Sequence, residues 1–455
     1  MSLTDGPVGG RLFRFVIPIL AGNILQQLYN SIDAMIIGRY VGENALGAIG
    51  VSQPIINVIL ALVIGLGIGE EILLGQYVGC RDERRIKQVF DTLFTSIMAL
   101  SFLVAICGYF ATPFLLRLIR TQPSQIEAAA AYLKIVFLGI PGIAGYNTMS
   151  GAIRASGNSK APLCFLLICT LLNGGLDLLM VKGLNMGVHG AAIATVVAQM
   201  VSFILCILYI NSAYPILRYH IRKLDFSTTM LRRGAKCAIP ASIQQCAVSV
   251  GMLLLQVVIN DLGPSAVTAY TIGSRIDSFA SAPIINIGQA LGIFTSQNLG
   301  AGKIERVREA KKYCLLWAYI VGGTLFVLLW GFGDSIARFF GAEGETVDMA
   351  KHYVQVLSSG YFIAGYFTVV EGLIRGTGNT LVPMASAISG YWIIRLPAAV
   401  LMKNVLGYWG VWLSVPTGWL FEFLLILCYY HSKRFQHSID VWSMRKESAY
   451  EQRMG

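Results

Sequence analysis

The sequence places acidic side chains inside long apolar segments. Asp33 follows Tyr29 by four residues, so the two side chains share one face of a predicted helix. Asp177 follows Asn173 by one helical turn in a later apolar segment. An ionisable side chain inside a membrane span costs about 2.5–3.5 kcal/mol on insertion scales, so such a residue indicates a functional site by default. Asp33 and Asp177 are therefore the first candidates.

Two kinds of chemistry suit buried acids of this type. A carboxyl group that is removed from water holds its proton more readily, so a buried Asp can exchange a proton near neutral pH. Alternatively, two carboxylates with an amide oxygen and a hydroxyl oxygen suit a hard alkali cation. Either chemistry lets an ion gradient bias a protein between two states, and the residues themselves leave both open.

Other acids lie closer to the ends of apolar segments. Glu70 and Glu71 end one segment and Glu371 ends another, where water can reach them, so they are candidates for lining a substrate cavity. Structural alternatives exist for the central acids as well. Asp33 could pair with a nearby Arg39, and Asp177 could make a polar contact between helices.

An internal repeat separates these alternatives. Gly151–Leu163 (GAIRASGNSKAPL) returns as Gly372–Met384 (GLIRGTGNTLVPM), at an offset of 372 − 151 = 221 residues. A period of half the chain indicates a duplicated domain rather than a solenoid. At this offset the positions of Asp33, Asn173 and Asp177 are occupied by Leu254, Ile394 and Ala398. Because one half does without these polar groups, duplicated packing does not require them, which favours a functional site.

Asp33, Asp177 and the other candidate acids are expected to lie on membrane helices. The chain has 455 residues, 55% of them hydrophobic and only 13% charged, whereas a soluble protein carries about a quarter charged residues. We predict an all-α polytopic membrane protein with about twelve spans in two pseudo-symmetric six-helix lobes. The predicted spans are 12–38, 45–74, 89–116, 126–150, 162–182, 188–210, 235–259, 265–295, 312–337, 347–372, 383–403 and 408–430.

The predicted organisation follows from these spans and from the charges between them. The N-lobe covers 1–210, a basic cytoplasmic linker covers 211–233, the C-lobe covers 234–430 and a cytoplasmic tail covers 431–455. Net charge is +11, but Lys and Arg gather in alternate connections, so they indicate topology with both termini cytoplasmic rather than nucleic-acid binding. The short, polar, Gly-rich start is not expected to be a cleavable signal.

No enzyme chemistry is visible in the sequence. It has no HExxH, GxSxG or P-loop pattern, its five His are scattered, and its nine Cys form no CxxC pair. Pro18 is of interest because it lies in the same predicted span as Asp33 and interrupts helical hydrogen bonding. Protonation of the acid could couple to a bend at this hinge, although a static kink is an equal alternative.

Four features of the sequence are distinctive when they are taken together. They are the opening segment GPVGGRLFRFVIPILAGNILQQLYNSIDAMIIGRYVGENALGAIG, the turns Gln76–Gly79 and Gln297–Gly300, both RxxGN repeats, and LLNGGLDLLMVKGLNMGVHGAAIATVVAQ at 171–199. In these features the chain resembles the multidrug and toxic compound extrusion family, in particular its DinF-like branch. The resemblance implies an antiporter, driven by protons or sodium, that exports organic and often cationic drugs or toxins by alternating access of two lobes. It implies no other cofactor.

The resemblance also implies roles for particular residues. A cation- or proton-binding group falls on Asp33, Asn173, Asp177 and Thr195, which together form a possible sodium site. Asn147 falls on the substrate cavity and Pro18 on the bend of the first helix. Tyr29, which shares a helical face with Asp33, is a further candidate for the cavity. The acids that a second branch of the family carries in the C-lobe are missing, since Val248 and Ala364 stand there. The coupling site is therefore expected in the N-lobe.

The expected partners are small organic cations and membrane lipids, for a monomer in a bacterial-type inner membrane. The alternative within the same superfamily is a flippase for lipid-linked oligosaccharides, whose cavity is rich in Arg. The candidates for in-span arginines are Arg39, at the edge of the first span, Arg275 and Arg395, and so small a number weighs against a flippase.

Overall fold

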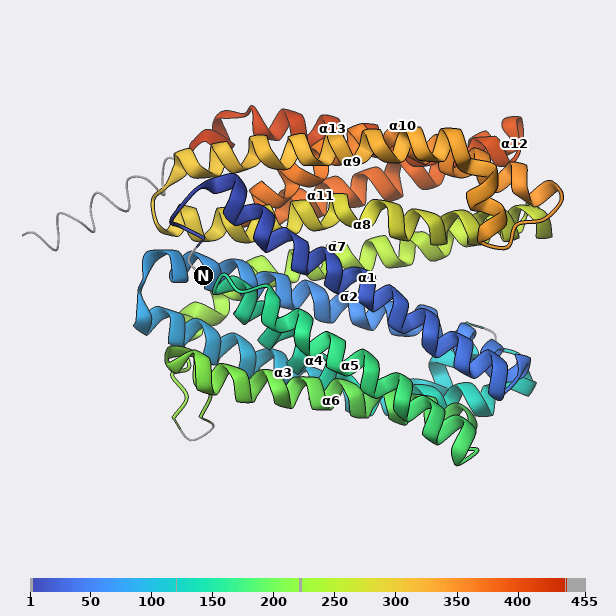
Figure 1. The fold of residues 1–455 in the computed structure, drawn as a ribbon, viewed down its shortest axis with the longest axis horizontal. Helices are drawn as coiled ribbons and strands as arrows, with labels where there is room; N and C mark the ends of the chain where they lie inside the picture. Colours follow the sequence, from blue (N-terminus) through green and yellow to red (C-terminus); the bar gives the residue numbers. More distant parts are fainter. Residues whose placement is uncertain (1–2, 120, 221–222, 438, 440–455) are drawn as a thin grey trace, which may run out of the picture. The chain divides into compact units, whose positions relative to one another are not determined.

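The computed structural model describes residues 3–119, 121–220, 223–437 and 439, and these residues form helices without a strand, as predicted (Figure 1). In the first half of the chain the helices are α1 (Val8–Tyr40), α2 (Glu43–Cys80), α3 (Glu83–Leu118), α4 (Pro123–Ala155), α5 (Lys160–Asp177), the π-helical turn η1 (Leu178–Gly183) and α6 (Gly187–Ala213). In the second half they are α7 (Thr228–Asn260), α8 (Pro264–Gly300), α9 (Ile304–Phe339), α10 (Glu345–Gly376), α11 (Leu381–Ile388), the π-helical turn η3 (Ser389–Arg395), α12 (Leu396–Leu406) and α13 (Tyr408–Tyr430).

Eleven of the described helices are long and apolar enough to cross a membrane, with α11, η3 and α12 forming one continuous span. About twelve spans are predicted from the sequence, and the difference is α8. This helix has 37 residues, which is ample length, but it is less apolar because it carries Arg275, Asp277 and several Ser and Thr side chains. The polytopic helical architecture predicted from composition is confirmed.

The chain separates into two compact units. Ile17–Gln245 belongs to the first unit, whereas Leu3–Val16 and the residues from Cys246 onward belong to the second. Both α1 and α7 are therefore divided, with one part of each helix in either unit. Pro18, the predicted hinge, lies inside α1 beside the first of these transitions. Of the predicted tail, residues 438 and 440–455 lie outside the described residues.

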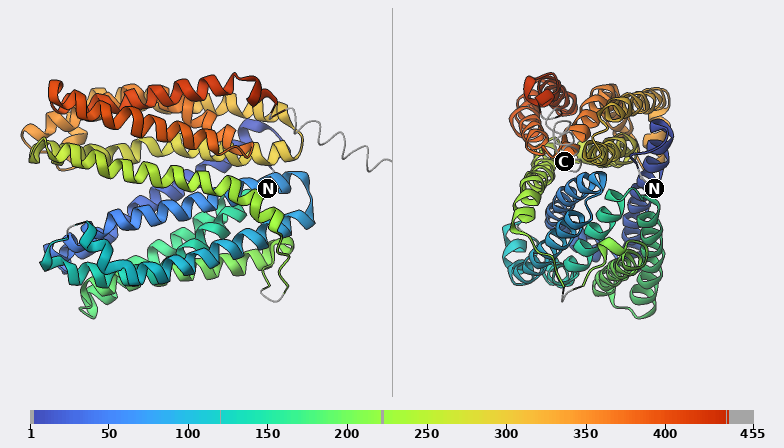
Figure 2. Two further views of the ribbon diagram at one scale, coloured as in Figure 1. Left: turned by 180° about the vertical axis from the view of Figure 1, so that it is seen from behind. Right: turned by 90° about the vertical axis from the view of Figure 1, so that its left-hand side faces the viewer.

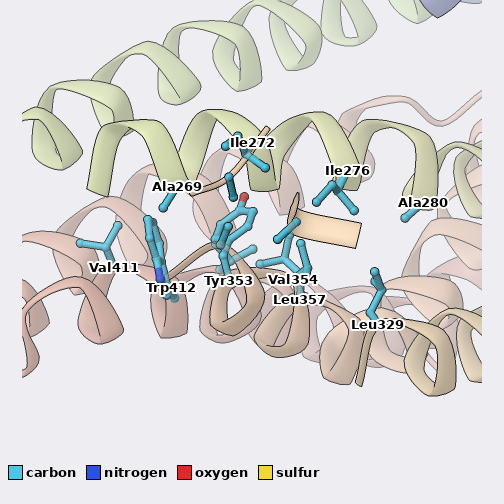
Figure 3. Close-up of a cluster of buried hydrophobic side chains, with 14 of the residues drawn as sticks. Ala269, Ile272, Ile276, Ala280, Leu329, Tyr353, Val354, Leu357, Val411 and Trp412 are labelled. Carbon is cyan, nitrogen blue, oxygen red and sulfur yellow. The ribbon is translucent and has the colours of Figure 1, made fainter. Parts of the chain in front are cut away.

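Each unit is organised around one central helix that carries an RxxGN repeat. In the first unit α4 packs against α2, α3 and α6, and in the second unit α10 packs against α8, α9 and α13. Figure 2 shows the helices of each unit running alongside one another. Aromatic residues fill the second core, where Tyr353 and Trp412 lie among Ala269 and Ile272 (Figure 3). The two central helices thus hold equivalent places in the duplicated halves.

The first residues of the chain are fastened to α8 and α9 within the second unit. Asn298 donates to the carbonyl oxygen of Leu3 at 3.3 Å, and Lys303 donates to that of Thr4 at 2.8 Å. Arg306 donates to the carbonyl oxygen of Gly6 at 2.7 Å. Because this segment continues directly into α1, the helix that carries Asp33 is anchored at its start to the second unit.

Candidate functional site

Three helices of the first unit bring the predicted coupling residues together. Asp33 comes from α1, Asn173 and Asp177 from the last two turns of α5, and Thr195 from α6. Asn173 and Asp177 are buried, and the amide Nδ2 of Asn173 donates to the Thr195 hydroxyl at 3.5 Å, a long hydrogen bond. The α5 helix ends at Asp177 and continues as η1, and π-helical turns of this kind are frequent at functional sites.

The carboxyl groups of Asp33 and Asp177 face each other within hydrogen-bonding reach. Among the described residues, both oxygens of Asp177 and the Oδ1 of Asp33 are buried without a hydrogen-bond donor, and a carboxylate that carries no proton can only accept hydrogen bonds. Two adjacent carboxylates cannot both ionise in such a place without repulsion. The arrangement therefore suits one proton shared by the pair or one cation held between them.

Two tyrosines complete the surroundings of the pair. Tyr29 is buried, and its hydroxyl lies close to Thr195. Tyr132, from α4, is also buried and lies near both Asp33 and Asp177. Tyr132 was not predicted from the sequence, although the repeat contains a signal for it, since 353 − 132 = 221 and Tyr353 occupies the equivalent place. A tyrosine is thus common to both halves, whereas the acids are specific to the first.

The set of oxygen donors favours a hard ion. The carboxylates of Asp33 and Asp177, the amide of Asn173 and the hydroxyl of Thr195 fit a proton or an alkali cation such as sodium better than a transition metal. In the part of the chain that the structure describes, no three His, Cys, Asp or Glu side chains gather in a metal-binding group.

Asn147 forms no hydrogen bond with this group among the described residues. It lies on α4, and its side-chain amide donates to the backbone carbonyl of Ile143 at 2.8 Å within the same helix. Its predicted place in a substrate cavity stays a prediction.

Two of the predicted cavity acids are held in ion pairs by the arginines of the repeat. Arg154 contacts Glu71 at 2.7 Å, and Arg375 contacts Glu371 at 2.6 Å. The arginines are equivalent, since 375 − 154 = 221, but Glu71 comes from α2 whereas Glu371 lies on the same helix as its partner. These contacts give Glu71 and Glu371 structural roles, and their part in substrate binding stays a prediction.

Glu70 is different because it is fully buried and neither of its carboxylate oxygens has a hydrogen-bond partner among the residues that the structure describes. Its charged neighbours are Glu71 and Arg154, so a single guanidinium serves two adjacent acids.

We expect Arg154→Ala to destabilise the protein by about 3 kcal/mol, because removing one partner of a mostly buried ion pair leaves charge uncompensated. The value is taken at the low end of the usual range since the Arg154 side chain keeps 28% of its surface exposed. Thermal unfolding in detergent measures the loss. Adding Glu70→Gln should recover part of it by removing one of the two acids, and a double variant no more stable than Arg154→Ala would contradict this account.

Comparisons with known proteins show the family and the fold of the chain. A family model described as MatE matches residues 18–179 and again 240–401, at an offset of 240 − 18 = 222. The Probable multidrug resistance protein YpnP of Bacillus subtilis is 30% identical over 96% of this chain and 97% of its own length. The Probable multidrug resistance protein YoeA of the same organism is 28% identical over 91% and 92%. A solved structure described as the outward-facing conformation of a multidrug resistance MATE family transporter of the MOP superfamily has a TM-score of 0.87, with 21% identity and coverage of 99% and 98%.

Proposed function

Because the chain belongs to the MatE family of transporters, we propose that it is a cation-coupled antiporter that exports organic, often cationic, drugs or toxins. The observation that carries the proposal is the buried pair of Asp33 and Asp177, which lies in one unit and is missing from its duplicate. Family membership places the chain among transporters rather than enzymes. The names of its relatives point to drugs as substrates.

In the proposed mechanism a proton or a sodium ion is the coupling ion, and it binds between Asp33 and Asp177 with help from Asn173 and Thr195. A ligand shifts an equilibrium between two states only by its different affinity for them. The ion therefore favours the state in which the acids are shielded, and the organic compound favours the other. Exchange between the two states by alternating access of the lobes gives antiport.

The membrane setting supports the same proposal. The protein is a multi-pass membrane protein, and we propose a bacterial inner membrane with both termini cytoplasmic, on the basis of the Lys and Arg in alternate connections. A membrane potential adds about 2.3 kcal/mol per charge for each 100 mV, which supports accumulation against a gradient. We propose a monomer as the working unit. A flippase is disfavoured because the chain offers only Arg39, Arg275 and Arg395 as in-span candidates and its relatives carry multidrug-resistance names.

The direct test is efflux of a fluorescent organic cation from proteoliposomes. Proton and sodium gradients are imposed separately, and wild type is compared with Asp33→Asn. We expect one gradient to drive wild-type efflux and the variant to lose that response. Efflux that neither gradient changes, with wild type and variant alike, would overturn the coupled mechanism, and lipid-linked substrates would then be tested.

A further inference from the structure

The second unit contains a buried arginine whose charge has no direct partner. Arg395 is the last residue of η3, and only 7% of its surface is exposed. Its guanidinium lies over the ring of Tyr391, 4.3 Å from the ring centre. Among the described residues it makes no hydrogen bond and has no carboxylate within 4.0 Å, and its Nε is buried without an acceptor.

Two acids lie near Arg395, but neither of them forms an ion pair with it. Asp277, on α8, accepts a hydrogen bond of 2.7 Å from the hydroxyl of Tyr361. Glu422, on α13, lies against the backbone of η3, where a side chain on Gly390 would overlap it. Both acids are near enough to influence Arg395 electrostatically, but neither forms an ion pair with it. The charge is therefore balanced at a distance, while the guanidinium's hydrogen-bond donors stay unused.

The surroundings hold Arg395 in place rather than leaving it free to turn away. A Cβ at Gly418 would come within 3.1 Å of the Cβ of Arg395, so α13 packs closely on the stem of the arginine. The ring of Tyr391 fits against Gly251, where a side chain would collide with it, and the Tyr391 hydroxyl is buried without a partner. The guanidinium of Arg395 and the hydroxyl of Tyr391 thus place two kinds of hydrogen-bond donor on one helical turn.

The duplicated first half shows whether packing alone requires an arginine at this position, just as the second half does for the acids of the first unit. Subtracting the offset gives 395 − 221 = 174, and Gly174 stands there. The shared packing of the halves therefore does not require an arginine at this position. An arginine that is mostly buried inside a span and has no acceptor for its guanidinium is costly and marks a functional site by default.

We propose that Arg395 and Tyr391 form a subsite of the second unit that binds the carboxylate of an amphipathic substrate. A carboxylate accepts two parallel hydrogen bonds from a guanidinium, which a simple cationic group cannot do. The subsite extends the substrate range from cations to zwitterions. This inference rests on the proposed export of organic compounds, and it is separable from it by experiment.

The test uses two dyes that differ in one group. One is a rhodamine with a free benzoic acid, which is zwitterionic, and the other is the methyl ester of the same dye, which is a cation. Binding to the purified full-length protein in detergent is followed by fluorescence polarisation for wild type, Arg395→Gln and Arg275→Gln. Arg275 is the matched control because it is an exposed arginine of the same unit.

We expect Arg395→Gln to weaken binding of the acid about tenfold or more, the loss of a charge-assisted hydrogen bond, and to leave binding of the ester unchanged. Arg275→Gln should alter neither. Retained binding of the ester shows that the variant is folded. If Arg395→Gln does not fold, Arg395→Lys decides, because it keeps the charge and loses the planar pair of donors, so the acid should still bind less tightly than in wild type.

The other outcomes are distinct. Equal binding of the acid by wild type and the Arg395 variant would show that Arg395 only balances Asp277 and Glu422, and would overturn the subsite. Binding of the ester but not the acid by wild type would also overturn it, while leaving the proposed function intact. If wild type binds neither dye, the proposed export of such compounds is what fails.

Discussion

Asp177→Asn is expected to abolish gradient-driven efflux in proteoliposomes, by at least about a hundredfold, while passive binding of the organic cation persists. The expectation rests on position, because Asp177 is fully buried, faces Asp33 and has no other partner for either oxygen. An amide keeps the shape of the side chain but neither becomes negatively charged nor binds and releases a proton near neutral pH. A hundredfold loss of the efflux rate corresponds to about 2.7 kcal/mol of free energy, which is a modest contribution for a buried ion-binding site.

The pair should behave as one functional unit. If Asp33 and Asp177 share a single ion, removing either acid already removes the site, so Asp33→Asn with Asp177→Asn should be no worse than one substitution alone. Initial rates of efflux under the driving gradient measure this for both single variants and the double variant. Asp261→Asn is the control, since that acid is mostly exposed and pairs with Lys403 at 2.7 Å near a helix end.

Two results would argue against this account. Losses that add, so that the double variant is far worse than either single one, would mean that the acids work at separate sites. Full activity of Asp177→Asn beside loss in Asp33→Asn would move the coupling site to α1 alone. In either case the oxygen cluster with Asn173 and Thr195 would be structural.

The helical architecture and the duplication could both be predicted from the sequence, because each produces a pattern that can be recognised without knowing which residues are in contact. Apolar runs of about twenty residues identify spans wherever they pack, and the offset of 221 between the RxxGN repeats needs no structure. The division of α1 and α7 between the units was not predictable in that way. Hydropathy shows that a segment enters the membrane, but not which neighbours it packs against, and these helices change neighbours within one continuous run.

The candidate site shows the same limit. Asp33 and Asp177 are 177 − 33 = 144 residues apart, so no spacing rule brings them together, and only the family resemblance implied that they act jointly. The ion pair of Glu371 and Arg375 could have been predicted from the sequence, because the two residues have an i, i+4 spacing on one helix. Glu71 and Arg154 were not, because their contact depends on how α2 packs against α4. Tyr132 was overlooked because a lone aromatic in an apolar span has no distinguishing pattern.

The other large effect is expected for Gly372→Ala, which should destabilise the protein by about 3 kcal/mol. At Gly372, α10 lies so close to α8 that an added Cβ would overlap the carbonyl oxygen of Gly288. One turn further on, a Cβ at Gly376 would lie 2.5 Å from the carbonyl oxygen of Gly292, so the close approach extends along the helix. Both sides of the contact are backbone, which cannot rotate out of the way, so the helices must separate.

The repeat provides the matched control for this substitution. Gly151 is the equivalent of Gly372, but an added Cβ there meets only ordinary contacts, 3.8 Å from Arg154 and 3.9 Å from Glu71 and from the carbonyl oxygen of Gly67. Gly151→Ala should therefore be neutral or gain up to about 1 kcal/mol, because Ala has the higher helix propensity. Thermal unfolding in one detergent compares the two variants. Equal melting temperatures would mean that the close approach of α8 and α10 is not what holds the core of the second unit, since the same chemical change is made at both sites and only the distance to the facing backbone differs.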